Sequence, residues 1–272
     1  MGKTRKFVVL LTVAALALSM FAVAGCEKKE DTDGTDTNGE ATFTTIEAGK
    51  LLVGSDTEFP PFEFVDADGV VKGFDVDIMN AIGEKLGLEV TFMTEIFDTL
   101  IPTLKAGGKF DVIASGMTIK PERALEIDFT APYYDSNQSL VMAKGTAYTG
   151  PEQLAGKKIG VQSGTTGEAW AKENAPDAEL VPFGSATDAF AALQAGNVDA
   201  VVNDLPVSAE LLKEDDRGLE IVAQIPTGEQ YGFAVSKDNP ELLAAIDEAL
   251  ADIKADGTYN DIYQKWFGIL PE

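Results

Sequence analysis

Two stretches of the chain share one pattern, and this repetition limits the possible fold more than any other feature. LKAGGKFDVIASG (104–116) and LQAGNVDAVVNDL (193–205) each contain a helix end, an Ala-Gly stop, an aspartate and an apolar strand. LLVGSD (51–56) and KKIGVQ (157–162) form a second, looser pair. Because the same unit occurs twice, the sequence predicts two related lobes.

Strand-like and helix-like segments alternate along the chain. Apolar residues recur at the helical period in DVDIMNAIGEKLG (75–87), and short apolar runs such as LEVTFM (88–93) indicate strands. Ser185, with Asp188 three residues later, is expected to cap another helix. This alternation predicts an α/β fold with mainly parallel sheets.

Ligands of open α/β sheets bind at the carboxyl ends of the strands. Four stretches follow predicted strands in this way: SDTEFPPF (55–62), ASGMT (114–118), QSGTTG (162–167) and NDLP (203–206). If the two lobes face each other, all four stretches meet in one cleft.

The N-terminal segment is a predicted export signal rather than part of the fold. Lys3, Arg5 and Lys6 precede 19 uncharged residues, 7–25, which end in VAGC and resemble the lipobox of bacterial lipoproteins. We expect residues 1–25 to be a signal peptide and residues 26–44 to hold a lipidated Cys26 and a flexible polar tether. A transmembrane helix is the alternative, since 19 uncharged residues could almost span a bilayer.

The composition excludes several classes of function. With 45 acidic and 21 basic residues, the net charge is −24, which argues against nucleic acid or an anionic membrane surface as the partner. The chain has no histidine, so it cannot carry a Ser-His-Asp or Cys-His catalytic centre. We expect neither a metal nor a cofactor, and the single cysteine cannot form an internal disulfide.

ASGMTIKPER (114–123) carries the strongest candidate for a ligand site. The planar guanidinium of Arg123 can bind a carboxylate through two hydrogen bonds, and Pro121 favours a helix start whose free N–H groups would also bind an anion. Ser115, Gly116 and Thr118 would let a ligand approach the backbone closely. Taken alone, a surface ion pair of Arg123 with a neighbouring glutamate is an equally good explanation.

The other candidates each have a structural alternative. SGTTG (163–167) could bind an anion at a helix start, or it could be an ordinary capped turn. Asp204 and Asp56 could bind an ammonium group, or they could cap helices. Phe59 and Phe97 could flank a ligand side chain or cation, or they could belong to the core.

Longer stretches resemble the bacterial extracellular solute-binding proteins for polar amino acids, the capture component of ABC importers. GFDVDIMNAIGEKL (73–86) matches the signature of that family, and DTEFPPFEF (56–64), ASGMTIKPER (114–123) and ADGTYNDIYQKWFG (255–268) are similar to it. The resemblance covers about residues 51–268.

This resemblance implies the type 2 periplasmic-binding-protein fold, in which two α/β lobes joined by two crossing strands close on a ligand like a flytrap. The implied lobe 1 is 45–132 plus 232–272, and the implied lobe 2 is 138–226. The hinge crossings would be 133–137 and 227–231.

The resemblance also implies a set of ligand-binding residues: Asp56, Phe59, Phe97, Ser115, Gly116, Thr118, Arg123, Gln162, Thr166 and Asp204. The α-carboxylate of the ligand would bind Arg123 and the backbone N–H groups of Thr118 and Thr166. Its α-ammonium group would bind Asp204, Thr118 and the Ser115–Gly116 corner.

At the other end of the ligand, Phe59 and Phe97 would flank the side chain, and Asp56 and Gln162 would lie near its tip. The glutamine-binding type of the family is the most similar, notably in EQYGFAVSK (229–237). However, Gln162 and Asn203 stand where that type has a lysine and a histidine. Without those cationic donors, the negative charge of Asp56 is less neutralised. Glutamine and the cationic amino acids arginine, lysine and histidine therefore all remain possible ligands.

We therefore expect a monomeric, lipid-tethered receptor and not an enzyme. It would capture a polar amino acid outside the cell membrane or in the periplasm, and deliver it to a membrane permease with a cytoplasmic ATPase. The alternatives are an enzyme similar to cyclohexadienyl dehydratase on the same fold, and a soluble sensor for an amino acid.

Overall fold

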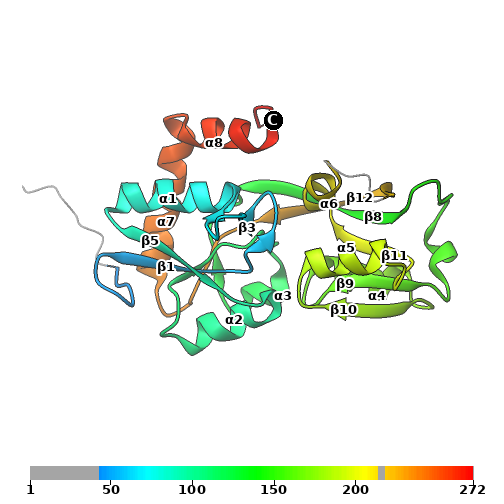
Figure 1. Ribbon diagram of the computed structural model, residues 1–272. Helices are drawn as coiled ribbons and strands as arrows, with labels where there is room; N and C mark the ends of the chain where they lie inside the picture. The colour runs from blue at the N-terminus through cyan, green and yellow to red at the C-terminus, as the bar shows by residue number, and fades with distance from the viewer. Residues whose placement is uncertain (1–42, 214–217, 272) are drawn as a thin grey trace, which may run out of the picture. The chain divides into compact units, whose positions relative to one another are not determined.

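The computed structural model describes residues 43–213 and 218–271. The predicted signal peptide, Cys26 and the tether up to residue 42 lie outside the described residues. Two five-stranded sheets organise the fold, and each is covered by helices (Figure 1). We call the elements around them lobe 1 and lobe 2.

The first sheet has the strand order β5-β1-β6-β13-β7. Its strands are β1 (Lys50–Ser55), β5 (Glu89–Thr94), β6 (Val112–Ile113), β7 (Asp128–Phe129) and β13 (Ala234–Val235). A small antiparallel sheet follows β1 in the chain and consists of β2 (Glu58–Phe59), β3 (Glu63–Val65) and β4 (Val71–Lys72). The helices of lobe 1 are α1 (Phe74–Leu86), α2 (Phe97–Ala106), α3 (Pro121–Ala124), α7 (Pro240–Ala255) and α8 (Thr258–Phe267).

The second sheet has the order β10-β9-β11-β8-β12. Its strands are β8 (Tyr134–Ala143), β9 (Lys158–Gln162), β10 (Glu179–Phe183), β11 (Ala200–Asp204) and β12 (Leu219–Tyr231). Its helices are the short 3₁₀ helix η1 (Pro151–Leu154), α4 (Thr166–Asn174), α5 (Ala186–Gln194) and α6 (Leu205–Leu212). None of the helices in the described part of the chain is both long and apolar enough to cross a membrane.

The buried side chains of β1 pack alternately on the two faces of the first sheet, and helices cover both faces. Leu51 and Val53 belong to the apolar cluster that includes buried residues of α1 and α7, whereas Leu52 packs with Leu100 and Leu104 of α2. Successive side chains of a strand point to opposite faces, and α1 and α2 accordingly lie on opposite sides of β1 (Figure 1).

The helix limits follow the predicted signals. Gly87, in the left-handed conformation with φ 68°, ends α1. The Ser185 hydroxyl accepts a hydrogen bond from the Asp188 N–H at 3.2 Å and caps α5, as predicted.

The α/β fold is confirmed, but the expectation of mainly parallel sheets is only half right. β1 is parallel to both β5 and β6, and β9 is parallel to both β10 and β11. In contrast, β8 is antiparallel to β11 and β12, and β13 is antiparallel to β6 and β7. The chain enters and leaves lobe 2 through β8 and β12, so strands near the crossing must run in opposite directions.

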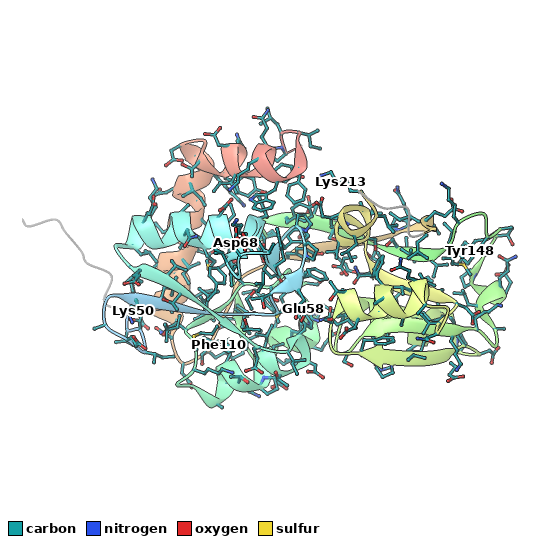
Figure 2. All side chains as sticks on the ribbon, viewed as in Figure 1. Lys50, Glu58, Asp68, Phe110, Tyr148 and Lys213 are labelled. Atoms are coloured by element: carbon teal, nitrogen blue, oxygen red, sulfur yellow. The ribbon has the colours of Figure 1, made fainter. Side chains whose placement is uncertain are left out.

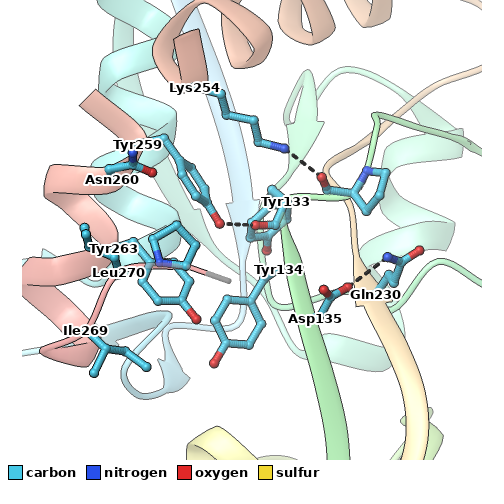
Figure 3. Close-up of a pocket in the computed structure, with 12 residues that line it drawn as sticks. Tyr133, Tyr134, Asp135, Gln230, Lys254, Tyr259, Asn260, Tyr263, Ile269 and Leu270 are labelled. Atoms are coloured by element: carbon cyan, nitrogen blue, oxygen red, sulfur yellow. Dashed lines mark hydrogen bonds between the residues drawn. The ribbon is translucent and has the colours of Figure 1, made fainter. Parts of the chain in front are cut away.

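β8 and β12 pair closely where the chain passes between the lobes. Tyr134 pairs with Tyr231, and Ser136 pairs with Glu229. Helices α7 and α8 hold the residues just before β8: Lys254 of α7 donates a hydrogen bond to the Pro132 carbonyl at 2.9 Å, and the Tyr259 hydroxyl of α8 donates to the Tyr133 carbonyl at 2.5 Å (Figure 3). The exact lobe boundaries remain a prediction.

Candidate ligand-binding site

One small cavity gathers side chains from both lobes at the carboxyl ends of the strands. Its lining residues are Phe59, Phe97, Gly116, Thr118, Arg123, Gln162, Thr165, Thr166 and Asp204. All of them except Thr165 are among the residues singled out from the sequence. The cavity encloses about 10 Å³, roughly the space that one water molecule needs.

Arg123 lies on α3, with Pro121 at the first turn of that helix. Its Nη1 donates to the Thr118 carbonyl at 2.8 Å, and its Nη2 donates to the Gly164 carbonyl of lobe 2 at 3.0 Å. Its guanidinium carbon lies 5.3 Å from the centre of the Phe97 ring, within the range of a cation–π contact. Two carbonyls therefore hold the guanidinium in place beside the cavity.

The two glutamates that could form a surface ion pair with Arg123 both pair with lysines instead. Glu122 pairs with Lys120 at 3.0 Å, and Glu126 pairs with Lys105. Burial lowers the pKa of Arg123, while the nearby carboxylates Asp204 and Glu229 oppose that effect. The guanidinium thus lies in a partly desolvated position that is balanced by acids.

Asp204 occupies the N-cap position of α6 but does not cap that helix with its side chain. Instead its carboxylate accepts a hydrogen bond from Gln138 Nε2 at 2.6 Å and another from the Tyr231 hydroxyl. Burial raises the pKa of Asp204 to about 7, and the Glu229 carboxylate adds to this rise. The carboxylate is therefore available to the cavity, and the capping interpretation is wrong.

Asp56 and Gln162 join the two lobes at the other end of the cavity. Gln162 Nε2 donates to the Asp56 carboxylate at 2.6 Å and to the Gly184 carbonyl at 3.1 Å. Burial raises the pKa of Asp56 to about 6, the Gln162 hydrogen bond opposes this rise, and Glu58 adds to it. Asp56 does not line the cavity, but it is hydrogen-bonded to Gln162, which does.

A second contact between the lobes lies near the rim. The Thr187 hydroxyl of α5 donates to the Glu58 carboxylate of β2 at 2.7 Å, and Figure 2 shows Glu58 on the side of lobe 1 that faces lobe 2. Gly164 also approaches α2 closely, because a Cβ on it would lie 2.9 Å from the Asp98 Cβ. The two lobes are therefore in direct contact around the cavity.

Gly116 forms the floor of the cavity, whereas the predicted site residue Ser115 does not line it. Both residues are held by two buried acids. The Ser115 hydroxyl accepts from the Asp56 N–H at 3.0 Å and donates to Glu63 at 2.8 Å, while the Gly116 N–H donates to Asp75 at 2.9 Å. Burial raises the pKa of Glu63, with the Asp75 charge adding to the rise, and burial also raises the pKa of Asp75.

Gly116 must be glycine at this point. Its φ is +50°, and a Cβ would lie 2.8 Å from the Phe59 ring. The absence of a side chain lets that ring reach the cavity.

Several residues that shape the site were missed by the sequence reasoning. Gln138, Glu229 and Tyr231 lie on the crossing strands, and Glu63 and Asp75 lie beneath the floor. One signal was available: in YDSNQSLVMA (134–143), Ser136 and Gln138 are two positions apart, so a strand points both polar side chains to the same face.

Comparison with known proteins decides the family. Residues 51–269 match the bacterial extracellular solute-binding proteins, family 3. The chain belongs to this family.

Among the described residues, no group of three or more acidic, cysteine or histidine side chains is placed to hold a metal ion.

Relatives within the solute-binding family match about four fifths of the chain. ABC transporter arginine-binding protein 1 of Escherichia coli (strain K12) is 39% identical over 231 residues, which are 83% of this chain and 94% of that protein. The structure of an ancestral arginine-binding protein bound to glutamine has a TM-score of 0.79 and 44% identity, covering 82% of this chain and 100% of that one. The two-lobed fold implied by the sequence is thus shown.

A third solute-binding relative bears on the alternative of an enzyme. It is the ancestral amino acid-binding protein AncCDT-1, a precursor of cyclohexadienyl dehydratase. Its structure has a TM-score of 0.73 and 39% identity, covering 80% of this chain and 95% of that one. This relative is itself described as a binding protein.

Proposed function

We propose that the protein captures a cationic amino acid of the arginine type, with glutamine as a weaker competitor, and delivers it to an ABC importer. The charge pattern of the cavity carries this proposal. One cation, Arg123, faces one end of the site, whereas the carboxylates Asp204 and Asp56 serve the middle and the far end. A ligand with one carboxylate and two cationic groups complements this pattern better than a ligand with a single cationic group.

Each end of the ligand has a defined partner in this arrangement. Its α-carboxylate binds the Arg123 guanidinium, a geometry that allows two parallel hydrogen bonds. Its α-ammonium group binds Asp204, and its guanidinium reaches Asp56 after displacing the Gln162 amide. Phe59 and Phe97 enclose the aliphatic part between these charges.

Binding requires the lobes to move. A cavity of about 10 Å³ cannot hold an amino acid, so the ligand enters when lobe 1 and lobe 2 part along the β8 and β12 crossing. Only interactions that are stronger in the closed form can drive closure. The groups of lobe 2 that can supply them are Asp204, Gln162 and the helix start at Thr166.

The place of the protein in the cell follows from its N-terminal sequence and its family. We infer that Cys26 is lipidated and that residues 26–44 tether the binding lobes to a membrane, outside the cell or in the periplasm. The closed protein then presents its ligand to a permease. The arginine-binding relative, itself named as part of an ABC transporter, supports this assignment.

An affinity screen tests the proposed function. Calorimetry with arginine, lysine, histidine and glutamine should give the tightest binding for arginine. Equal or tighter binding of glutamine would refute the preference for a cationic ligand, and no heat with any amino acid would refute the function itself. Incubation with prephenate or arogenate should leave both compounds unchanged, whereas their loss would indicate the dehydratase alternative.

A further inference from the structure

Glu229 is a buried carboxylate that lies behind the proposed ligand cavity. It belongs to β12, at the point where that strand crosses between the lobes, and only 9% of its surface is exposed. Burying a carboxylate is unfavourable unless hydrogen-bond donors surround it. The identity of its donors therefore indicates what Glu229 does.

Both lobes supply donors to Glu229. Its Oε2 accepts from the Thr118 hydroxyl at 2.8 Å and from the Thr166 hydroxyl at 2.7 Å, and its Oε1 accepts from Gln138 Nε2 at 3.1 Å. Thr118 precedes α3 in lobe 1, whereas Thr166 is the first residue of α4 in lobe 2. One carboxylate oxygen thus holds a hydroxyl group from each lobe.

These contacts set the direction of both hydroxyl groups. A hydroxyl has one hydrogen to donate and two lone pairs to accept with. Because both hydroxyls donate to Glu229 Oε2, the hydrogens of Thr118 and Thr166 point toward Glu229. Gln138 Nε2 lies 2.6 Å from Asp204 Oδ1 and 3.1 Å from the Thr166 oxygen, so its two hydrogens are shared among these two acceptors and Glu229 Oε1. The Thr166 oxygen can thus accept from Gln138 while its own hydrogen points toward Glu229.

Both threonines line the cavity next to Asp204, whereas Glu229 does not. With their hydrogens committed to Glu229, the two hydroxyl oxygens can only accept hydrogen bonds from a ligand. Such oxygens suit an ammonium group and repel a carboxylate.

We propose that Glu229 is a positioning residue that makes the hydroxyls of Thr118 and Thr166 acceptors for the α-ammonium group of the ligand. Together with Asp204 they form one ammonium subsite, so Glu229 helps to set which end of the amino acid lies there. This inference rests on the proposed amino-acid-binding function and assigns a role to a residue on the hinge strand.

The test compares two ligands that differ only in the α-amino group: arginine and 5-guanidinopentanoate. In Glu229→Gln, the size is kept, but the new amide nitrogen can donate to a threonine oxygen and so lets the hydroxyl reverse. Calorimetry on the full chain should show arginine binding at least about tenfold more weakly. The affinity for 5-guanidinopentanoate should change by less than about threefold.

Glu173→Gln is the matched control, since it removes the same charge from an exposed position of α4. Glu173 and Glu229 both line a surface groove that is distinct from the ligand cavity. This control should change neither affinity. An equal loss of both affinities in Glu229→Gln would overturn the proposal, because it would mean that Glu229 only supports the fold. An unchanged affinity for arginine would also overturn it.

A double-mutant cycle keeps the proposal falsifiable if the first variant is unstable. Thr118→Val removes a hydroxyl without changing the size of the side chain. If Glu229 acts through this hydroxyl, Thr118→Val should lower the arginine affinity selectively, and adding Glu229→Gln should cause less than its separate loss. Fully additive losses would refute the coupling. If the wild-type protein binds neither arginine nor glutamine, it is the proposed function that fails.

Discussion

Replacing Asp56 by asparagine should abolish the preference for arginine over glutamine. Asp56 is 5% exposed, and its carboxylate accepts a hydrogen bond from Gln162 at 2.6 Å. Asparagine keeps the volume and one acceptor oxygen but removes the charge. A ligand guanidinium loses the attraction between two opposite charges in this variant, whereas a ligand amide, which carries no charge, keeps a hydrogen bond to the remaining acceptor oxygen.

The size of the effect follows from the kind of hydrogen bond that is lost. A hydrogen bond to a buried charged group contributes about 1.5–3 kcal/mol, which corresponds to about a 10- to 150-fold change in the dissociation constant. The arginine affinity of Asp56→Asn should fall by this factor. The glutamine affinity should stay within about threefold of the wild-type value.

The same carboxylate should make arginine binding depend on pH. Burial raises the pKa of Asp56 to about 6, with Glu58 adding to the rise and the Gln162 hydrogen bond opposing it. Arginine needs the ionised form, so its affinity relative to that of glutamine should rise as the pH rises through this value and then level off. At about pH 5 roughly a tenth of Asp56 is ionised, and the ratio of the arginine affinity to the glutamine affinity should be about tenfold lower than at neutral pH.

A second titrating group in the cavity makes the ratio of affinities the right quantity to measure. In the proposed arrangement Asp204, whose pKa burial raises to about 7, faces the α-ammonium group that both ligands share. Its ionisation therefore cancels in the ratio of the arginine affinity to the glutamine affinity. Only the part of the pH dependence that arises at the tip of the side chain remains.

Calorimetry with both ligands between about pH 5 and about pH 8 measures this ratio. Asp68→Asn is the matched control, because Asp68 is an exposed carboxylate of lobe 1 in the turn between β3 and β4 (Figure 2). The control should keep the wild-type ratio. A wild-type ratio in Asp56→Asn, or a ratio in the wild-type protein that does not change with pH, would refute the role of Asp56.

Three further predictions concern Arg123, the cavity floor at Gly116, and the buried acids Asp75 and Glu63. Arg123→Ala should still unfold cooperatively in circular dichroism but give no heat with arginine or glutamine; retained affinity would place the carboxylate elsewhere. Gly116→Ala should lower the free energy of unfolding in urea by about 1–3 kcal/mol, because its φ is +50° and its Cβ would lie 2.8 Å from the Phe59 ring; unchanged stability would contradict this contact. Burial raises the pKa of Asp75 and of Glu63, so the native state holds protons more tightly than the unfolded state, and stability should fall as the pH rises above about 4. Asp75→Asn should flatten that fall in urea titrations, and an unchanged slope would count against the buried pair.

The sequence could predict which segments meet because the carboxyl ends of parallel strands lie at the same edge of a sheet. SDTEFPPF (55–62), ASGMT (114–118), QSGTTG (162–167) and NDLP (203–206) do meet, and each supplies a lining or bridging residue of the cavity. Arg123 could be chosen because a guanidinium after small residues suits a carboxylate. Whether these residues bind a ligand stays a prediction.

The residues behind the cavity could not be found in the same way, because their roles depend on contacts between distant segments. Glu63 lies 52 positions from its partner Ser115, and Glu229 lies 111 positions from Thr118. No local pattern gives such pairings. The strand directions next to the crossing were mispredicted for the same reason, since they follow from where the chain leaves and re-enters a lobe.

The Asp56–Gln162 contact gives a physical reason why the closed form itself can discriminate between ligands. In this structure the Asp56 carboxylate already has a neutral donor, the Gln162 amide from the opposite lobe. In the proposed complex, arginine would replace that donor by a charged one and so add the attraction between two opposite charges in a buried position. Glutamine would replace one amide by another and gain little. Closure is driven only by the difference between the new and the displaced contacts. Because both ligands would have to displace the Gln162 amide, the net gain would be the charge–charge attraction that only arginine makes.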